Sequence, residues 1–318
     1  MTTGNWKLGI ILSLTTAMMW SFLPISIIPL LGTLDPVTIT FYRLSGGGLM
    51  IFIYLLLTGH KPSKIKITKS LLLFLSVAIL FLCANYYSWL KGLEMTTPAT
   101  AQVVIQIAPM LLLLGSVVFF HESFSLKQGL GVGIFIVGLL LFFNQRLVSL
   151  ISELSSFNLG IYYVIFASVT WAIYGLAQKR LLRDFQALEL IFIIVTAGAL
   201  VFLPLATPSK IMQLNTLQLW MLAFGAMNTA VAYGCFTQAM YHWDTSRVSA
   251  VVAVVPVLTL GIGYLQQQIF PDFMPAESIN TLSIIGAIVV VVGSGITALS
   301  KSSTKSSNKS DVAQLDHD

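Results

Sequence analysis

Long apolar segments separated by short polar breaks dominate the sequence. An apolar stretch of about 20 residues is long enough to cross a bilayer as one helix. The breaks carry turn-forming residues, for example Gly32 to Pro36 and Pro208 to Asn215. The pattern predicts an all-α integral membrane protein with ten transmembrane helices, near residues 8–30, 37–58, 70–92, 97–119, 127–145, 158–178, 185–205, 217–241, 247–267 and 281–300.

Composition supports this class and excludes others. Of the 318 residues 56% are hydrophobic and 9% are charged, whereas soluble domains carry about 25% charged residues. The net charge is +5, but the basic residues are scattered between apolar segments, which does not favour nucleic-acid binding. Cys83 and Cys235 lie far apart inside apolar segments, so neither a disulfide framework nor a metal site is expected. HExxH, GxSxG and GxxxxGK[ST] patterns do not occur, so we expect no enzyme and no cofactor.

The distribution of Lys and Arg predicts the orientation, because cytoplasmic loops hold most of these residues. We expect a multi-pass protein of the cell (inner) membrane with both termini in the cytoplasm. In this orientation 13 of the 17 basic residues fall on the cytoplasmic side and three on the other. Arg43 is left within a span. Residues 301–318 are rich in Ser and Lys, and we expect a disordered cytoplasmic tail there.

The two halves of the chain are weak copies of each other. A shift of 147 residues places Tyr86 on Tyr233 and Pro109 on Pro256, and a slightly different shift places Trp20 on Trp171. Five helices per half is an odd number, so the second copy is expected to cross the membrane upside down. The predicted units are a first five-helix repeat over residues 1–150 and a second, inverted one over residues 151–300.

These features together resemble the drug/metabolite transporter superfamily, in particular its ten-helix EamA-type members. The resemblance covers about residues 8–300 and rests on the tryptophan in the first helix of each half, on Arg43 and on the entry to the fourth helix before Pro109. It also rests on Glu122, Gln128, Gly131 and Gly138, although His121 stands where the family usually has Gly. The resemblance implies a secondary carrier of small organic solutes.

Polar and charged side chains within the spans are costly in lipid, so they indicate contacts with protein, water or a solute. Arg43 either anchors a carboxylate or phosphate, or caps backbone carbonyls between helices. Gln102 and Gln106 share one helix face and either line a pocket or bond neighbouring helices. Pro109 and Pro256 are predicted to bend their helices. The candidate substrate site consists of Trp20, Arg43, Asn85, Tyr86, Gln102, Gln106, Trp171, Tyr174 and Tyr233.

The predicted function is export of small organic metabolites by alternating access, with amino acids and related compounds as the best candidates. Aromatic rings, amides and one cation suit a solute with an apolar part and an anionic part. Multidrug efflux, transport of nucleotide sugars or other organic anions, and a receptor or scaffold are the alternatives. A coupling ion such as a proton is not determined by the sequence.

Overall fold

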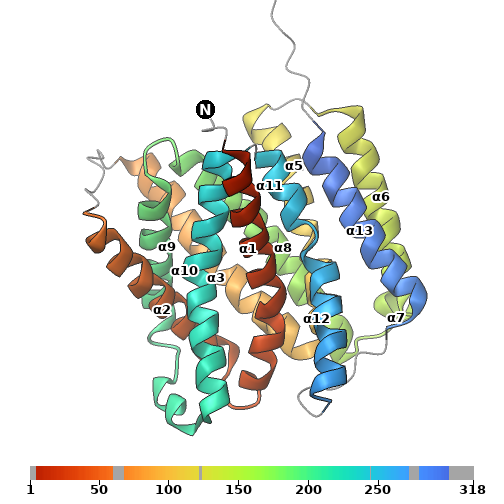
Figure 1. Ribbon diagram of the computed structural model, residues 1–318, viewed down its shortest axis with the longest axis horizontal. Coiled ribbons are helices and arrows are strands. Elements are labelled where there is room, and N and C mark those ends of the chain that lie inside the picture. Colours follow the sequence, from red (N-terminus) through yellow and green to blue (C-terminus); the bar gives the residue numbers. More distant parts are fainter. Residues whose placement is uncertain (1–4, 60–67, 122–123, 244, 272–278, 301–318) are drawn as a thin grey trace, which may run out of the picture.

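The computed structural model describes residues 5–59, 68–121, 124–243, 245–271 and 279–300, which form helices joined by short connections (Figure 1). The predicted tail at 301–318 and Glu122 lie outside the described residues. In chain order the helices are α1 (Trp6–Ile27), η1 (Ile28–Leu30), α2 (Pro36–Leu57), α3 (Lys69–Met95), α4 (Pro98–Val104), α5 (Ile107–Phe120), α6 (Leu126–Phe142), α7 (Leu147–Ser152), α8 (Ser156–Leu181), α9 (Ala187–Phe202), η2 (Pro208–Gln213), α10 (Thr216–His242), α11 (Thr245–Val252), α12 (Val255–Ile269) and α13 (Thr281–Leu299).

The helices begin where the sequence supplies a capping side chain. Asp35, Thr68, Ser125 and Asn215 each accept a hydrogen bond from the backbone N–H three residues later. Such a cap satisfies one of the N–H groups that the first turn of a helix leaves unpaired. The polar breaks therefore set the helix starts as well as the turns.

Eight helical segments in the described part of the chain are long and apolar enough to cross a membrane. Two more, α6 and α9, are apolar but shorter than 18 residues. The all-helical membrane fold is thus confirmed, whereas the count of ten spans stays a prediction. The start of α1 and the end of α13 lie at the same end of the molecule (Figure 1), as an even number of crossings requires.

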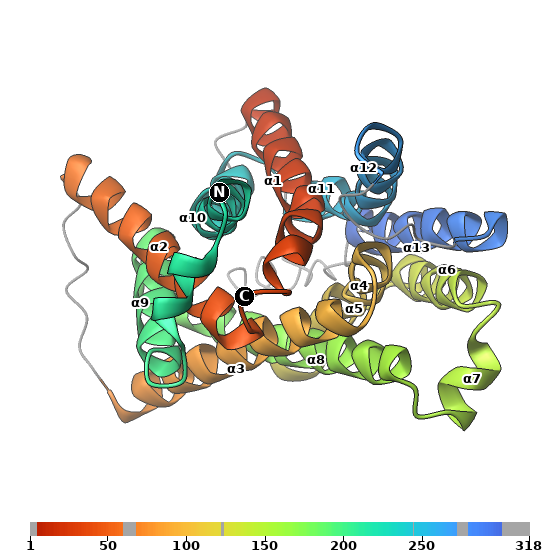
Figure 2. The same ribbon diagram turned by 90° about the horizontal axis from the view of Figure 1, so that it is seen from below.

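Helices from the first and second halves of the chain pack against each other. The main pairs are α3 with α8, α6 with α13, α1 with α10, α2 with α10, and α2 with α9. Seen from below, α2 and α9 lie at one end of the bundle and α6 and α13 at the other (Figure 2). The pair α6 and α13 is in backbone contact, because a Cβ atom added to Gly138 would lie 2.5 Å from the backbone nitrogen of Val290.

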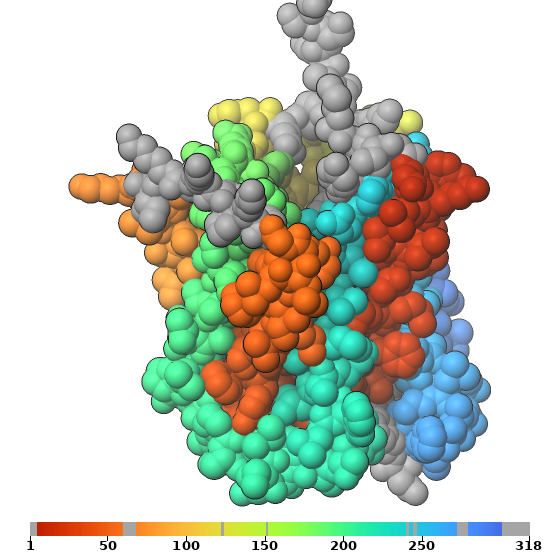
Figure 3. All heavy atoms as spheres, turned by 60° about the vertical axis from the view of Figure 1, so that its left-hand side comes forward, coloured from red at the N-terminus to blue at the C-terminus, as the bar shows by residue number. Residues whose placement is uncertain are grey.

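The outer surface is apolar, as expected of a surface that faces lipid. Leu57 is 83% exposed, Leu126 92% and Trp220 71%. Figure 3 shows the face of the molecule on which α2 and α10 lie side by side. In water this surface would be unfavourable, because each Å² of exposed apolar area costs roughly 25 cal/mol.

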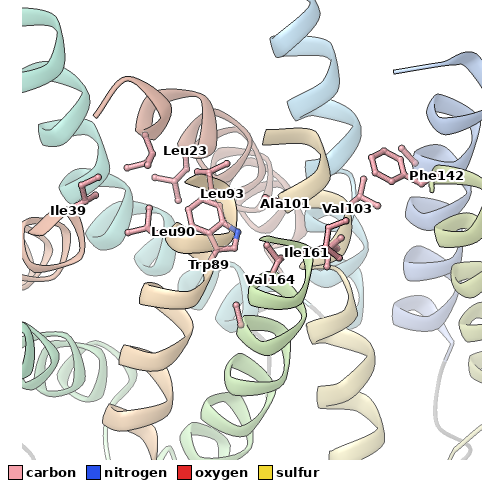
Figure 4. Packing of buried hydrophobic residues seen from close by; sticks show 14 of the residues in the cluster. Leu23, Ile39, Trp89, Leu90, Leu93, Ala101, Val103, Phe142, Ile161 and Val164 are labelled. Carbon is pink, nitrogen blue, oxygen red and sulfur yellow. The ribbon is translucent and has the colours of Figure 1, made fainter. Parts of the chain in front are cut away.

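Two hydrophobic clusters fill the interior. One extends from α1 and α3 to α6 and α13, and Figure 4 shows part of it, with Leu23, Leu90 and Leu93 close together. The other lies between α2, α3, α8 and α9 and includes Tyr86 and Tyr174. This second cluster surrounds the polar residues described next.

Candidate functional site

Arg43 is buried in the middle of the bundle, with 3% of its surface exposed. It lies on α2, two turns from the helix start, and its aliphatic stem packs against Gly225 of α10, where an added Cβ would lie 3.3 Å from the Cγ of Arg43. The guanidinium carbon lies 4.7 Å from the ring centroid of Tyr86. Its Nε atom has no hydrogen-bond partner among the described residues. The guanidinium is therefore supported by an aromatic face and retains free donors.

Four aromatic side chains from four helices lie next to Arg43 or next to its aromatic neighbours. Tyr86 comes from α3, Tyr174 from α8 and Tyr233 from α10, and all three line one small cavity. Trp20 of α1 lies edge-on to Tyr233, with 5.5 Å between ring centroids. We call Trp20, Arg43, Tyr86, Tyr174 and Tyr233 the Arg43 cluster. Its members come from both halves of the chain.

A small cavity adjoins the Arg43 cluster. Tyr86, Tyr174 and Tyr233 line one part of it, and Leu82, Ile191, Ile194 and Val195 form its apolar wall. It leaves room for about one water molecule (about 10 Å³). The helices must separate before an organic solute can enter. Trp171, another predicted site residue, is partly buried and packs against the same hydrophobic cluster.

The ion pairs formed by the described acidic residues lie near helix ends, away from Arg43. Glu94 pairs with Lys91 at 2.6 Å, and Asp184 pairs with Arg180 at 2.8 Å. Asp35 caps α2 and lies 3.7 Å from Lys210. In the described residues no group of three or more His, Cys, Asp or Glu side chains could hold a metal ion.

The pKa of Asp35 is lowered. Partial burial opposes ionisation, but hydrogen bonds from the backbone N–H and the hydroxyl of Thr38, both 2.9 Å long, and the charge of Lys210 outweigh it. The connection between α9 and α10 is tied to the start of α2 through this carboxylate.

Two of the predicted site amides bond to backbone carbonyls of neighbouring helices. Asn85 donates to the carbonyl of Ala167, at 2.9 Å, and Gln102 donates to the carbonyl of Trp20, at 2.7 Å. The second bond has a clear cause: Pro24 lies four residues after Trp20 and has no N–H to donate. The sequence contained the signal, a proline inside the first apolar segment, but the prediction did not use it.

The helices that contain Pro109 and Pro256 are interrupted. The predicted spans at 97–119 and 247–267 are each two helices, α4 with α5 and α11 with α12. Both interruptions lie within four residues before the proline, and the two meet, because Gln106 Nε2 donates to the carbonyl of Ala253 at 2.9 Å. Whether these helices bend during transport stays a prediction.

A groove of about 340 Å³ lies along the contact between α2 and α10. Its residues include Tyr42, Gly46, Leu222 and Ala226. A Cβ atom on Gly46 would lie 2.7 Å from the Cβ of Ala226, so small residues let the two helices approach closely. The same close contact holds the stem of Arg43 against α10.

A bundle of apolar helices around a buried cation and aromatic residues is typical of a membrane transport protein. A match to a known family assigns the chain to this class of proteins. The model of the EamA-like transporter family matches residues 7–144 and again residues 158–299, so the chain belongs to that family. The family consists of transporters, and the prediction that the chain is not an enzyme is confirmed.

Similar proteins carry names of the same kind. The chain is 33% identical over 293 residues to the "Uncharacterized inner membrane transporter YhbE" of Escherichia coli, covering 92% of this chain and 91% of that protein. It is 29% identical over 292 residues to an "Uncharacterized transporter" of Haemophilus influenzae, covering 92% and 95%. The fold is also similar to that in a crystal structure of another protein, with a TM-score of 0.63 and 16% sequence identity. The superposition covers 91% of this chain and 96% of that chain.

Proposed function

We propose that this transporter is an alternating-access carrier of small organic solutes with an anionic group, built from ten spans in two inverted five-helix repeats. The Arg43 cluster is the proposed substrate site. The two matches to the family model, one in each half, support the repeat. The packing also supports the repeat. In the repeat α3 corresponds to α10 and α1 to α8, and the contact between α3 and α8 has its counterpart in the contact between α10 and α1.

Individual hydrogen bonds also support the repeat. Gln106 and Ala253, which are bonded to each other, are separated by 147 positions, the shift that aligns the two halves. Each interrupted helix therefore contacts its own counterpart at the equivalent position. Two further buried bonds are equivalent to each other, because Asn85 aligns with Ala232 and Thr16 aligns with Ala167. Asn85 donates to the carbonyl of Ala167, and Thr16 donates to the carbonyl of Ala232.

The observation that carries the substrate site is the buried guanidinium of Arg43. A charged group within a span costs about 2.5 to 3.5 kcal/mol on insertion scales. Arg43 lies where helices of both halves meet, and its neighbour Tyr86 lines a cavity of tyrosine and aliphatic side chains. Transporters place their solute sites at such an interface near the midplane. An anionic group would give the guanidinium the partner that offsets its burial.

We propose export as the direction of transport and a cytoplasmic position for both termini. The excess of Lys and Arg on one side supports this orientation. A variant without Cys83 and Cys235 can carry one new cysteine at Arg183 or at Met212, both exposed. The cysteine at Met212 should react with a membrane-impermeant maleimide in intact cells, and the one at Arg183 only in opened cells. The opposite result would refute the orientation.

Reconstituted vesicles test the function. The purified protein is first screened against a metabolite collection for ligands that raise its melting temperature, because a ligand that binds only the folded state stabilises it. Stabilising compounds are then offered in labelled form to vesicles with and without protein. Arg43→Gln should abolish uptake of anionic solutes, whereas Arg146→Gln, which changes a cation stacked on Phe157 outside the site, should not. Unchanged uptake in Arg43→Gln would refute the site.

A further inference from the structure

We infer that the preferred solute is an organic monocarboxylate with an apolar body and without an ammonium group. This inference rests on the proposed function and narrows its substrate class. It comes from which polar groups of the site are free to bind a solute and which are already engaged.

The free groups suit one carboxylate. A guanidinium presents paired N–H donors that match the two oxygens of a carboxylate. Arg43 is held by its stem at Gly225 and by its stacking on Tyr86, which orients the guanidinium before a solute arrives. Tyr174 and Tyr233 line the neighbouring cavity, and a phenol group can donate one hydrogen bond to a solute. One cation and one carboxylate also balance, so the complex buries no net charge.

A carboxylate would be the strongest partner for an ammonium, and none of the residues that line the cavity beside Arg43 carries one. The amide nitrogens of Asn85 and Gln102 donate to backbone carbonyls of neighbouring helices, at 2.9 and 2.7 Å, which fixes the orientation of both side chains. Gln106 is likewise bonded to the opposite half of the chain. The carboxylates of Glu94 and Asp184 pair with their own neighbours at helix ends.

An ammonium would also be repelled within the site. In an α-amino acid the ammonium lies next to the carboxylate, so binding of the carboxylate to Arg43 brings the ammonium within a few Å of the guanidinium. Repulsion between two like charges is strong where water is excluded. The ammonium would have to lose its hydration to occupy this place. The zwitterion should therefore bind more weakly than the matching acid.

The apolar wall accounts for the other end of the solute. Leu82, Ile191, Ile194 and Val195 form an apolar wall of the cavity, whose lining also includes the three tyrosines. When the helices separate, this wall offers an apolar surface to a hydrocarbon body whose carboxylate is held by Arg43. Small-molecule sites commonly combine such an apolar wall with a few placed polar groups.

Two matched sets of probes test the inference. The aromatic set is 3-phenylpropionate, phenylalanine, phenethylamine and phenyl phosphate, and the aliphatic set is 4-methylpentanoate, leucine and isopentylamine. Binding to the purified full-length protein is measured by thermal shift at pH 7, and transport by counterflow of the labelled compound in vesicles. In at least one set the acid should bind and exchange at least tenfold better than its amino acid, and the amine should not bind.

Variants locate the effect. Arg43→Gln should remove acid binding, and Arg146→Gln should leave it unchanged. Tyr174→Phe keeps the ring and the charge but removes one hydroxyl, and it should weaken acid binding several-fold. Because the selectivity among the probes is measured on the unaltered protein, the inference is testable even where Arg43→Gln fails to fold.

The outcomes separate this inference from the proposed function. An amino acid that binds as well as its acid, or phenyl phosphate that binds better, would overturn the monocarboxylate assignment while transport of an anionic solute stands. Binding of no acid in either set would overturn it as well. Selective exchange of the amines, undiminished in Arg43→Gln, would overturn both proposals.

Discussion

The bond between Gln102 and the carbonyl of Trp20 provides a sharp test of how the bundle is held together. Gln102→Ala removes a 2.7 Å hydrogen bond between α4 and α1. It leaves the Trp20 carbonyl without a donor, since the residue that would donate in a regular helix is Pro24. We expect this variant to be clearly destabilised.

The expected magnitude follows from the loss of a single buried donor. A buried polar group left unsatisfied costs about 1–3 kcal/mol. Hydrogen bonds between membrane helices average about 0.6 kcal/mol, with a maximum near 1.7 kcal/mol. The carbonyl of Trp20 belongs to the costlier class, because it loses both its helical partner and Gln102. We therefore expect a loss of about 1–2 kcal/mol in the free energy of unfolding.

A double-mutant cycle isolates this term. Pro24→Ala restores a backbone N–H four residues after Trp20, so the carbonyl regains a helical partner. In the Pro24→Ala background, Gln102→Ala should cost at least about 0.5 kcal/mol less than in the unaltered protein. Unfolding in mixed micelles of increasing denaturing detergent measures all four proteins. An equal cost in both backgrounds would refute the role assigned to Pro24.

Three further predictions concern other parts of the molecule. Gly138→Leu should lower the melting temperature and Gly133→Leu, on the same helix, should not, because a Cβ on Gly138 meets backbone of α13 and one on Gly133 meets nothing within 4 Å; equal melting temperatures would contradict the packing. Asp35→Asn should lower the melting temperature slightly at pH 7, and the difference should vanish as the pH falls below the lowered pKa of Asp35. Its contribution is complete above the ordinary pKa of 3.8 and lost below the folded one, so an equal difference at pH 7 and pH 3 would exclude a charge effect. Pro109→Ala should reduce solute flux more than it reduces folded yield, and unchanged flux in well-folded protein would remove Pro109 from the mechanism.

The positions of the helices can be predicted from the sequence because a helix that crosses lipid requires a long apolar segment. Each predicted apolar segment contains a helix or a pair of helices, with ends set by capping residues such as Asp35 and Asn215. The interruptions before Pro109 and Pro256 were expected only as bends. The missing N–H of a proline shows where a helical hydrogen bond is lost. Whether the helix only bends there or is interrupted depends on whether another side chain can donate to the carbonyl that the proline leaves unpaired.

The sequence predicted which residues lie together in the candidate site better than it predicted which groups they contact. The Arg43 cluster brings together five of the predicted residues, because charged and aromatic groups within spans must find partners. The amides Asn85, Gln102 and Gln106 are buried as expected, yet they bond to backbone carbonyls of other helices. Sequence alone does not reveal this use, because the acceptor is a backbone atom distant in the chain.

In the proposed alternating-access carrier with two inverted repeats, the contact between Gln106 and Ala253 has an energetic consequence. Identical copies that exchange roles would give inward-facing and outward-facing conformations of equal free energy. Here one copy supplies an amide donor and the other a methyl group at the equivalent position. A difference of one internal hydrogen bond, about 0.5–1.5 kcal/mol, would make one conformation roughly two- to thirteen-fold more populated than the other. A duplicated protein can thus acquire a preferred resting side through a single divergent pair of residues.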